Sequence, residues 1–407
     1  MKCRHCQTDL EHLFLDLGFA PPSNAYVSAE RLNQPETTFP LRVRVCDQCW
    51  LVQTEDYAGS DELFQADYAY FSSTSKSWLK HATDYVEMIT KRLNLGPDSF
   101  VIELASNDGY LLKNFVAAGI PCLGIEPTSG TAAAAEALGI PVVREFFGSK
   151  LALQLAQDGK KADLIIGNNV FAHVPDINDF TLGIKSALLP NGTTTLEFPH
   201  LLQLIENGQF DTVYHEHYSY LSLHTVTRIF ASEGLRVFDV EELPTHGGSL
   251  RIYGCHAEDP RYETLTVNAI LQREKDGDLL DIAGYSGFQK RAENVKDQLL
   301  MFLIEQKKQG KKVVAYGAAA KGNTLLNFAG VKPDLLTFVC DAAPSKQGKF
   351  LPGSHIPVRE PDVLDTAEYD FVLVLAWNLV DEITEQLKKN LKSKTTFVTA
   401  VPELRFW

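Results

Sequence analysis

The chain has 407 residues, in which 52 acidic side chains outnumber 38 basic ones and give a formal net charge of −14. This length suggests two or three domains, and the acidic balance argues against a protein that gains its affinity by neutralising a nucleic-acid backbone. Hydrophobic residues make up 45% of the chain, as in folded proteins, and no apolar run approaches the ~18 residues of a membrane span. We therefore expect no nucleic-acid partner and no membrane segment. Because the N-terminus lacks the apolar core of a signal peptide, we also expect a cytoplasmic location.

The first predicted unit is rich in cysteine. Cys3 and Cys6 form one Cys-x-x-Cys pair, Cys46 and Cys49 form a second, and 39 residues lie between the two pairs. In a reducing compartment, two such pairs suit four thiolates around one Zn²⁺, and the alternative is a redox pair beside an unrelated one. Four cysteines close the tetrahedron, so we expect the zinc to hold residues 1–66 together as a small module and to take no part in catalysis.

The next part of the chain alternates strand and helix patterns. A strand-like run at 39–45 leads into the second cysteine pair, and residues 76–93 show helical periodicity. The following runs predict strands at 99–104, 121–126, 162–167 and 193–198, and helices at 110–118 and 131–138. This order is typical of a parallel α/β sheet that binds ligands at the carboxyl ends of its strands. We assign residues 67–253 to this Rossmann-like domain.

A charge-rich helical stretch at 256–309 leads to a second α/β pattern. Strands are predicted at 312–316, 336–341 and 369–376, with a glycine turn and a helix after the first of them. The fold class is therefore α/β, with a small N-terminal zinc-binding module, a central Rossmann-like domain and a second Rossmann-like domain at residues 254–407.

The loop after the first strand of the central domain favours S-adenosylmethionine over a dinucleotide. A dinucleotide fingerprint has three glycines, whereas this loop has only Gly109, with Ala105 and Asn107 where earlier glycines would stand. Glu126 ends the second strand, where a carboxylate can accept hydrogen bonds from ribose hydroxyls. An NAD-binding or purely structural sheet is the alternative. The candidate cofactor residues are Glu103, Ala105, Asn107, Asp108, Gly109, Glu126 and Asn168.

Residues 214–220 bring together many side chains that can carry protons. The sequence Tyr214-His215-Glu216-His217 lacks the second histidine of a zinc-protease motif, because position 219 is serine. If the segment is extended, His215 and His217 point to the same side and Glu216 to the other. Such a cluster suits proton abstraction next to a carbonyl, with a histidine as the base and a tyrosine or second histidine steadying the enolate oxygen. The alternative is a structural role for each side chain.

Several motifs together resemble one family, the S-adenosylmethionine-dependent sugar C-methyltransferases that make branched deoxysugars. The resemblance covers nearly the whole chain and implies a zinc module, a cofactor domain and a C-terminal α/β domain. It also implies methylation at C3 of a dTDP-linked 4-keto-6-deoxy sugar, without a catalytic metal. The motifs are the twin Cys-x-x-Cys pairs and residues 22–26, 68–73, 169–176, 197–200, 214–217 and 317–323.

Position by position, the resemblance implies that His217 is the general base. Tyr214 and Glu216 would line the reacting centre, with His173 and Tyr68 nearby. A C4 ketone acidifies the C3 proton, so its removal gives an enolate that attacks the methyl group directly, and positioning supplies much of the rate.

The C-terminal unit is expected to hold the nucleotide sugar. Its strand-to-helix turn at 317–323 places small residues and Lys321 where a diphosphate can bind, whereas Lys346 and Lys349 lie in a loop that is equally well explained as solvated. Residues 246–249 are predicted to form a tight loop near the cleft, without an assigned role. The expected substrate-binding residues are Tyr70, Phe71, Lys321, Asn323, Asp341 and Lys349.

Two other functions remain open from the sequence. One is a nicotinamide-dependent oxidoreductase or epimerase of nucleotide sugars that uses both α/β units. The other is a zinc-ribbon interaction protein without turnover, which leaves the histidine cluster unexplained. For assembly, a monomer is the default expectation.

Overall fold

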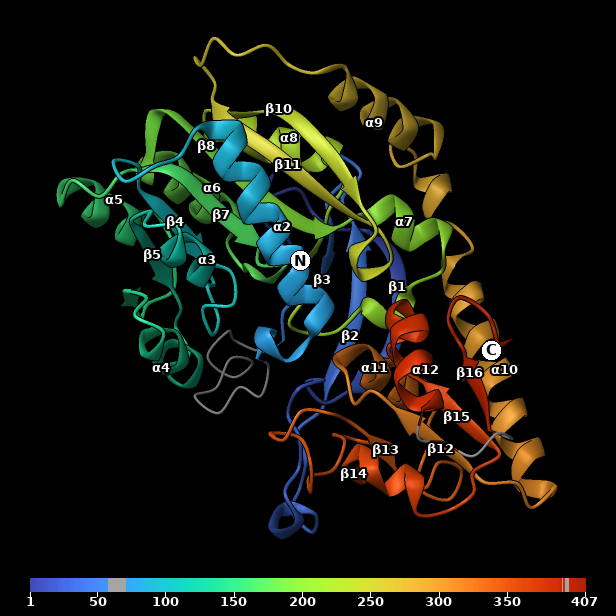
Figure 1. Ribbon diagram of the computed structural model, residues 1–407. Coiled ribbons are helices and arrows are strands. Elements are labelled where there is room, and N and C mark those ends of the chain that lie inside the picture. Colours follow the sequence, from blue (N-terminus) through green and yellow to red (C-terminus); the bar gives the residue numbers. More distant parts are fainter. Residues whose placement is uncertain (58–70, 390, 392–394) are drawn as a thin grey trace.

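The computed structural model describes residues 1–57, 71–389, 391 and 395–407, and its strands form three sheets (Figure 1). The first sheet has the order β1-β2-β3-β9 and is antiparallel. Its strands are β1 (His12–Ala20), β2 (Phe39–Val45), β3 (Val52–Thr54) and β9 (Ser219–Tyr220). Because β9 comes from the middle of the chain, the N-terminal sheet is completed by a strand that follows the 214–217 motif.

The central sheet has the order β10-β11-β8-β7-β4-β5-β6. Neighbours from β6 to β8 are parallel, whereas β8–β11 and β11–β10 are antiparallel. The four strands expected in this sheet, β4, β5, β7 and β8, are parallel as predicted. Strands β10 and β11 were not predicted from the sequence, and they form an antiparallel hairpin at one edge because a short turn joins them. The strands are β4 (Val101–Leu104), β5 (Cys122–Ile125), β6 (Val142–Val143), β7 (Ala162–Asn168), β8 (Leu188–Pro199), β10 (Leu235–Leu243) and β11 (Ser249–His256).

Helices cover both faces of the central sheet. Helix α2 (Lys76–Leu93) begins where the Ser75 side chain accepts from the N–H of Trp78, and it ends at Asn94 in a left-handed conformation. It packs with α3 (Leu112–Ala117) on one face, while α5 (Ser149–Gln157), α6 (Ile177–Ala187) and α8 (Leu223–Ser232) contribute to the core on the other. Helix α4 (Ser129–Ala137) contacts the edge strand β6, whereas α7 (Leu201–Glu206) contributes to the core that the N-terminal strands share with the C-terminal unit.

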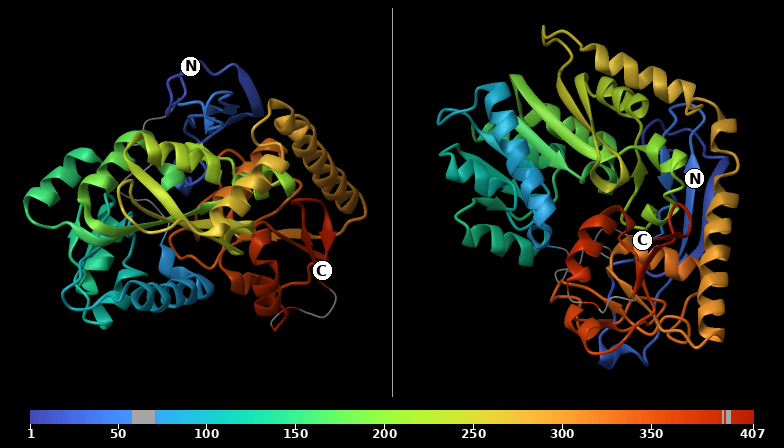
Figure 2. Two further views of the ribbon diagram at one scale, coloured as in Figure 1. Left: turned by 90° about the horizontal axis from the view of Figure 1, so that it is seen from above. Right: turned by 45° about the vertical axis from the view of Figure 1, so that its right-hand side comes forward.

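The C-terminal sheet has the order β14-β13-β12-β15-β16-β17 and is parallel except for its last pair. The long helix α10 runs beside both this sheet and the N-terminal strands (Figure 2). The elements are α9 (Leu265–Asp276), α10 (Phe288–Lys308), β12 (Val313–Tyr316), α11 (Ala320–Phe328), β13 (Val339–Cys340), β14 (Val358–Arg359), β15 (Phe371–Val374), α12 (Val380–Lys388), β16 (Thr396–Thr399) and β17 (Arg405–Phe406). Within the described residues, no helix is long and apolar enough to cross a membrane.

Candidate functional site

Four cysteine side chains converge in the N-terminal module. Cys3 and Cys6 come from the first turn, Cys46 and Cys49 from the turn between β2 and β3, and their Sγ atoms all lie within 4.8 Å of one another. The Sγ atoms are 3.5 Å apart in the Cys3–Cys49 pair and in the Cys6–Cys46 pair. A tetrahedral Zn²⁺ with Zn–S bonds of about 2.3 Å places its sulfurs roughly 3.8 Å apart. The cluster therefore has the ligands and the size of a four-coordinate zinc site.

The hydrogen bonds within the cluster favour a thiolate. The Cys49 thiol lowers the pKa of Cys3 to about 4, and Gln53 Nε2 lies 3.2 Å from Cys3 Sγ as a further donor. The same contact raises the pKa of Cys49. A buried thiolate surrounded by further thiols can bind a divalent cation, because the cation displaces the remaining thiol protons and each sulfur becomes a ligand.

The expected cofactor residues meet at the carboxyl edge of the central sheet. Glu103 lies within β4, Glu126 follows β5, and Asn168 ends β7. The backbone N–H of Asn107 donates to Glu126 Oε2 over 3.0 Å, so the loop after β4 is tied to the end of β5. All seven candidate cofactor residues thus lie on or beside three adjacent strands.

The loop after β4 takes a backbone path that explains its residues. Ala105, Asn107 and Gly109 have positive φ angles of 53°, 50° and 76°. A Cβ at Gly109 would collide with Ile140 Cδ1 and crowd Ala135, and together with the positive φ these contacts favour glycine at this position. The N–H of Ser72 donates to Asn107 Oδ1 over 2.9 Å. This hydrogen bond holds the short 3₁₀ turn before α2 against the loop.

Buried polar atoms at this edge fit a polar ligand. Burial and the nearby carboxylates of Asp108 and Glu126 raise the pKa of Glu103, and burial raises the pKa of Glu126. Leaving such atoms unpaired costs about 1–3 kcal/mol each, and the amine, carboxylate, ribose and adenine groups of S-adenosylmethionine could pair with them. Within the described residues, the atoms without a partner include Ser106 Oγ, Asp108 Oδ1, Asn169 Oδ1 and both polar atoms of the Asn168 amide.

The 214–217 motif forms a turn, so the expectation for an extended segment does not apply. The N–H of His217 donates to the carbonyl of Tyr214 over 2.9 Å. In this turn His215 faces β2, where its Nε2 lies 3.3 Å from the carbonyl oxygen of Pro40. The short 3₁₀ turn at Phe210–Thr212 just before the motif prevents a continuous strand here.

All three parts of the molecule hold this turn. From the N-terminal module, Thr54 Oγ1 donates to the carbonyl of His217 over 3.2 Å, and Asn24 Nδ2 donates to Glu216 Oε1 over 3.1 Å. From helix α11 of the C-terminal unit, Thr324 Oγ1 donates to the carbonyl of Val213 over 2.8 Å. The proposed base therefore lies where the three parts meet.

The hydrogen bonds of His217 determine which nitrogen carries its proton. Its Nδ1 lies 2.9 Å from the carbonyl oxygen of Thr212, which can only accept, so the proton is on Nδ1 and the lone pair is on Nε2. Its ring centroid lies 3.9 Å from that of Tyr214 and 4.6 Å from that of His173. The three expected side chains are thus brought into contact.

Burial keeps both histidines neutral. It lowers the pKa of His217 well below the usual value, and His173 adds to this shift. The pKa of His173 falls to about 4, also through burial, and its Nδ1 lies 2.8 Å from the carbonyl oxygen of Glu216. Glu216 is itself fully buried, which raises the pKa of its carboxyl. A neutral imidazole with an accessible lone pair can take a proton from carbon.

Lys321 lies near the start of α11, at the seam between the central and C-terminal parts. Its Nζ donates to Asn378 Oδ1 over 2.6 Å and lies 4.6 Å from the centroid of the Trp377 ring. Trp377 Nε1 donates in turn to Asp211 Oδ2 over 2.8 Å. Burial lowers the pKa of Lys321 and raises the pKa of Asp211 to about 6. A positive charge held in this way can bind an anionic group.

Two other expected substrate residues have structural partners. Asn323 Nδ2 donates to the carbonyl of Ser23 over 2.6 Å, which links α11 to the N-terminal module. Asp341 accepts from the N–H of Ala343 over 2.8 Å and lies 3.4 Å from Lys346 Nζ. These contacts occupy both carboxylate oxygens of Asp341 and the amide nitrogen of Asn323. They leave Asn323 Oδ1 without a partner among the described residues.

Among the described residues, no hydrogen bond joins Lys349 or Phe71 to this group. Lys349 lies in the connection between β13 and β14, where its carbonyl accepts from the N–H of Val358 over 2.8 Å, and no hydrogen bond or ion pair of its side chain occurs among the described residues. Phe71 directly precedes the short 3₁₀ turn at Ser72–Thr74. Tyr68 and Tyr70 lie outside the described residues.

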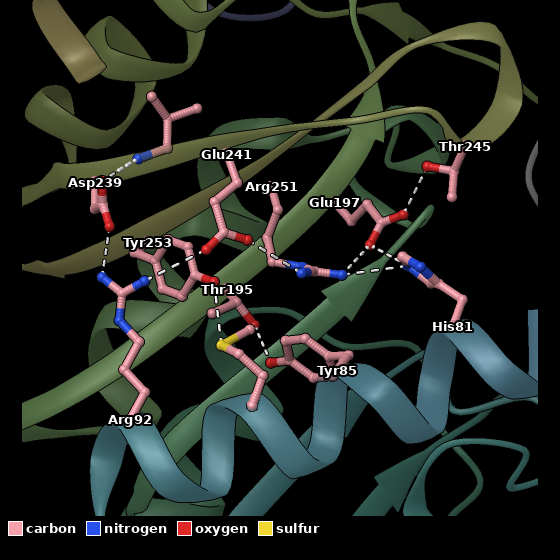
Figure 3. Close-up of polar contacts among 12 residues, drawn as sticks. His81, Tyr85, Arg92, Thr195, Glu197, Asp239, Glu241, Thr245, Arg251 and Tyr253 are labelled. Carbon is pink, nitrogen blue, oxygen red and sulfur yellow. Dashed lines mark hydrogen bonds and ion pairs between the residues drawn. The ribbon is translucent and has the colours of Figure 1, made fainter.

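A buried network of charges links helix α2 to the cofactor edge (Figure 3). Glu197 Oε2 accepts from Arg251 Nη2 over 3.0 Å and lies 2.9 Å from His81 Nε2, while Glu197 Oε1 accepts from Thr245 Oγ1 over 3.0 Å. Glu197 is opposite Asn168 in the register of β7 and β8. The network therefore fixes α2 and the β10–β11 connection beside the cofactor residues.

Sequence reasoning missed this network and two parts of the site. In the sequence, Glu197 and Arg251 each stand within an apolar strand-like run, and two opposite charges in such runs could have indicated a buried ion pair. Trp377 directly after the strand at 369–376 was a signal for the Lys321 surroundings, because ligands bind at strand ends. The contact between the Thr212 carbonyl and His217 could not be predicted from the sequence, because every residue carries a backbone carbonyl.

Comparisons with known proteins identify three regions of the chain. Family models match residues 3–64 (zinc binding domain), 78–240 (methyltransferase domain) and 244–402 (C-methyltransferase C-terminal domain). The C-methyltransferase NovU of Streptomyces niveus is 33% identical over 404 residues, which cover 99% of this chain and 96% of that protein.

Two solved structures that resemble the chain each match less than half of it. An S-adenosylmethionine-dependent methyltransferase from Clostridium acetobutylicum is 10% identical, with a TM-score of 0.35, and the match covers 44% of this chain and 92% of that one. An S-adenosylmethionine-dependent methyltransferase from Mesorhizobium loti is 13% identical, with a TM-score of 0.35, over 43% of this chain and 99% of that one.

Proposed function

The chain belongs to the S-adenosylmethionine-dependent C-methyltransferases, and from that premise we propose that it transfers a methyl group to C3 of a dTDP-linked 4-keto-6-deoxy sugar. The similarity to a C-methyltransferase extends over 99% of the chain, which makes it evidence against a nicotinamide-dependent enzyme and against a protein without turnover. In this proposal the product is a branched deoxysugar, and the zinc is structural.

The observation that carries the proposal is the state of His217. Its Nδ1–H is held by the carbonyl of Thr212, its Nε2 carries the lone pair, and burial keeps the ring neutral. In the proposed reaction Nε2 takes the C3 proton, and the electron pair of the C–H bond moves into the C3–C4 bond of the enolate. The Thr212 carbonyl then stabilises the imidazolium that forms. Tyr214, in contact with the His217 ring, is the candidate donor to the enolate oxygen.

The carboxyl edge of the central sheet is the proposed cofactor site. We assign Glu126 to the ribose hydroxyls and the unpartnered amide of Asn168 to the adenine or the methionine end. When bound, S-adenosylmethionine supplies an electrophilic methyl group. The chain's own contribution is to hold the acceptor carbon in line with that group and to exclude water, and no covalent intermediate with the protein is needed.

The proposed contact with the nucleotide diphosphate is Lys321. Its ammonium group lies at the seam that also holds the 214–217 turn, and its neighbours Asn378 and Trp377 orient it. A diphosphate can be held by one local turn around Lys321 and a few nearby donors, so the net charge of −14 does not conflict with an anionic substrate.

Mass spectrometry and NMR test the proposal directly. The protein is incubated with S-adenosylmethionine and dTDP-4-keto-6-deoxyglucose or its 3-amino and 2,3-dideoxy relatives, and we expect one added methyl group at C3. In deuterated water with S-adenosylhomocysteine in place of the methyl donor, we expect hydrogen exchange at C3 alone. Methylation at another carbon would overturn the assigned position, and no transfer to any of these sugars would overturn the substrate class.

A further inference from the structure

The connection between β10 and β11 has an unusual backbone. His246 has φ 54° and ψ 21°, and Gly247 and Gly248 follow with φ angles of 87° and 118°. A histidine in the left-handed region is unfavourable because its Cβ crowds the backbone. Such a conformation persists only where the surroundings impose it, and it is often found at functional sites.

The surroundings do impose this conformation. A Cβ at Gly247 would lie 2.5 Å from the Trp377 ring and 2.7 Å from Gln209 Nε2, so the connection is packed against the C-terminal part. Gln209 Nε2 also donates to the carbonyl of Gly247 over 2.8 Å. On the other side, Thr245 is held by Glu197. The His246 side chain is therefore fixed in one direction.

One nitrogen of His246 is already used. Asn169 Nδ2 lies 3.0 Å from His246 Nε2, and because an amide nitrogen only donates, Nε2 is the acceptor. Burial lowers the pKa of His246 to about 4, so the ring is neutral at pH 7 and its proton is on Nδ1. The half-buried ring thus presents a hydrogen-bond donor at Nδ1.

His246 lies close to both parts of the proposed substrate site. Its partner Asn169 lies four residues before His173, whose ring contacts that of His217. The Trp377 ring that packs against the His246 connection also contacts Lys321. His246 is thus flanked by neighbours of the proposed base and by neighbours of the proposed diphosphate contact.

We propose that His246 is a further substrate-binding residue, whose Nδ1–H donates a hydrogen bond to a hydroxyl or carbonyl oxygen of the acceptor sugar. This inference rests on the proposed function, because it requires an oxygen-rich acceptor beside His217. The opposing interpretation is that His246 only anchors Asn169 through Nε2.

Two substitutions separate these interpretations. His246→Asn places an amide nitrogen near the position of Nδ1 and tolerates the left-handed backbone, so it keeps the donor and loses the contact with Asn169. His246→Gln reaches the position of Nε2, so it can keep the contact with Asn169 and loses the donor. We expect kcat/KM within a few-fold of the unsubstituted enzyme for His246→Asn. For His246→Gln we expect a loss of about tenfold, mainly in KM for the sugar. Equal or greater activity of His246→Gln would overturn the proposal.

A spectroscopic measurement on the unsubstituted enzyme does not depend on the activity of the variants. With ¹⁵N-labelled histidine, the His246 Nδ1–H resonance, assigned by its absence in His246→Gln, should move downfield when the keto sugar and S-adenosylhomocysteine are added. An unchanged resonance would overturn the proposal. If the unsubstituted enzyme transfers methyl to none of the sugars, the proposed function fails together with this inference. If it is active and the resonance does not move, only this inference fails.

Discussion

At the scale of single residues, the proposed chemistry depends on the Nε2 lone pair of His217. His217→Gln removes the base, so we expect methyl transfer to fall by about 10²–10⁴-fold. Exchange of the C3 hydrogen in deuterated water should be lost as well, because it needs the same proton transfer. Binding of S-adenosylhomocysteine, measured by calorimetry, should be unchanged, since the cofactor residues lie on other segments.

His215 provides a matched control in the same turn. Its Nε2 contacts the carbonyl of Pro40, and its ring lies edge-on to Phe39, so it faces the N-terminal sheet. His215→Gln should lower the midpoint of thermal unfolding and leave the C3 exchange rate largely intact. If it abolishes exchange as completely as His217→Gln, the assignment of the base is wrong.

The pH dependence of the reaction follows from the lowered pKa of His217. An imidazole acts as a general base only when it is neutral, and a lowered pKa extends its neutral form to more acidic solutions. We therefore expect kcat/KM for the sugar to stay nearly constant between about pH 7.5 and pH 6. An ordinary histidine with a pKa of ~6.5 would be mostly protonated at about pH 6, and its rate would already have fallen there. A fall to half the maximal rate near pH 6.5 would contradict the burial of the catalytic imidazole.

At the scale of elements, the zinc cluster closes the turn between β2 and β3. We expect one zinc ion per chain by elemental analysis, and Cys46→Ser should lose it and lower the midpoint of thermal unfolding. Cys340→Ala is the control, because Cys340 is buried in β13 outside the cluster, and this variant should keep its zinc. Loss of methyl transfer on chelation before any loss of structure would contradict a purely structural metal.

The regular elements were largely predictable from the sequence. The strand at 39–45 and the helix at 76–93 match β2 and α2 to the residue, because alternation and helical periodicity are unambiguous there. Strand β8 begins at Leu188, before the expected 193, since Pro190-Asn191-Gly192 interrupt the strand signal. The pairing of β9 with β3 joins segments far apart in the chain, and no local pattern encodes it.

The candidate site was predictable only in part. The residue types of the 214–217 motif indicate proton transfer, whereas their orientation depends on a turn held by Thr54, Asn24 and Thr324 from other parts of the chain. The tautomer of His217 depends on a backbone carbonyl, which no sequence pattern marks. The roles assigned to these residues stay predictions until the substitutions above are measured.

At the scale of the whole molecule, the N-terminal strands and the C-terminal unit share one hydrophobic core. Phe14 in β1 stacks on Phe288 in α10 at 4.6 Å and meets Tyr285 edge-on at 5.5 Å. Gln289 accepts from the N–H of Asp16 over 2.8 Å and donates to its carbonyl over 3.2 Å. Because the 214–217 turn is also held from both sides, the site should depend on the docking of the two ends of the chain.

This dependence predicts different outcomes for two phenylalanines of one strand. Phe14→Ala leaves a cavity between β1 and α10, and we expect it to cost about 3–5 kcal/mol and to destabilise both regions together. Phe19→Ala removes a side chain that is 65% exposed and should change stability by less than about 0.5 kcal/mol. Hydrogen exchange monitored by mass spectrometry should show faster exchange in Phe14→Ala both in β1–β3 and in α10–α11. Faster exchange in β1–β3 alone would mean that the C-terminal unit is stable without the N-terminal strands. Docking of these strands would then position the residues of the site but would not be needed for the C-terminal unit to fold.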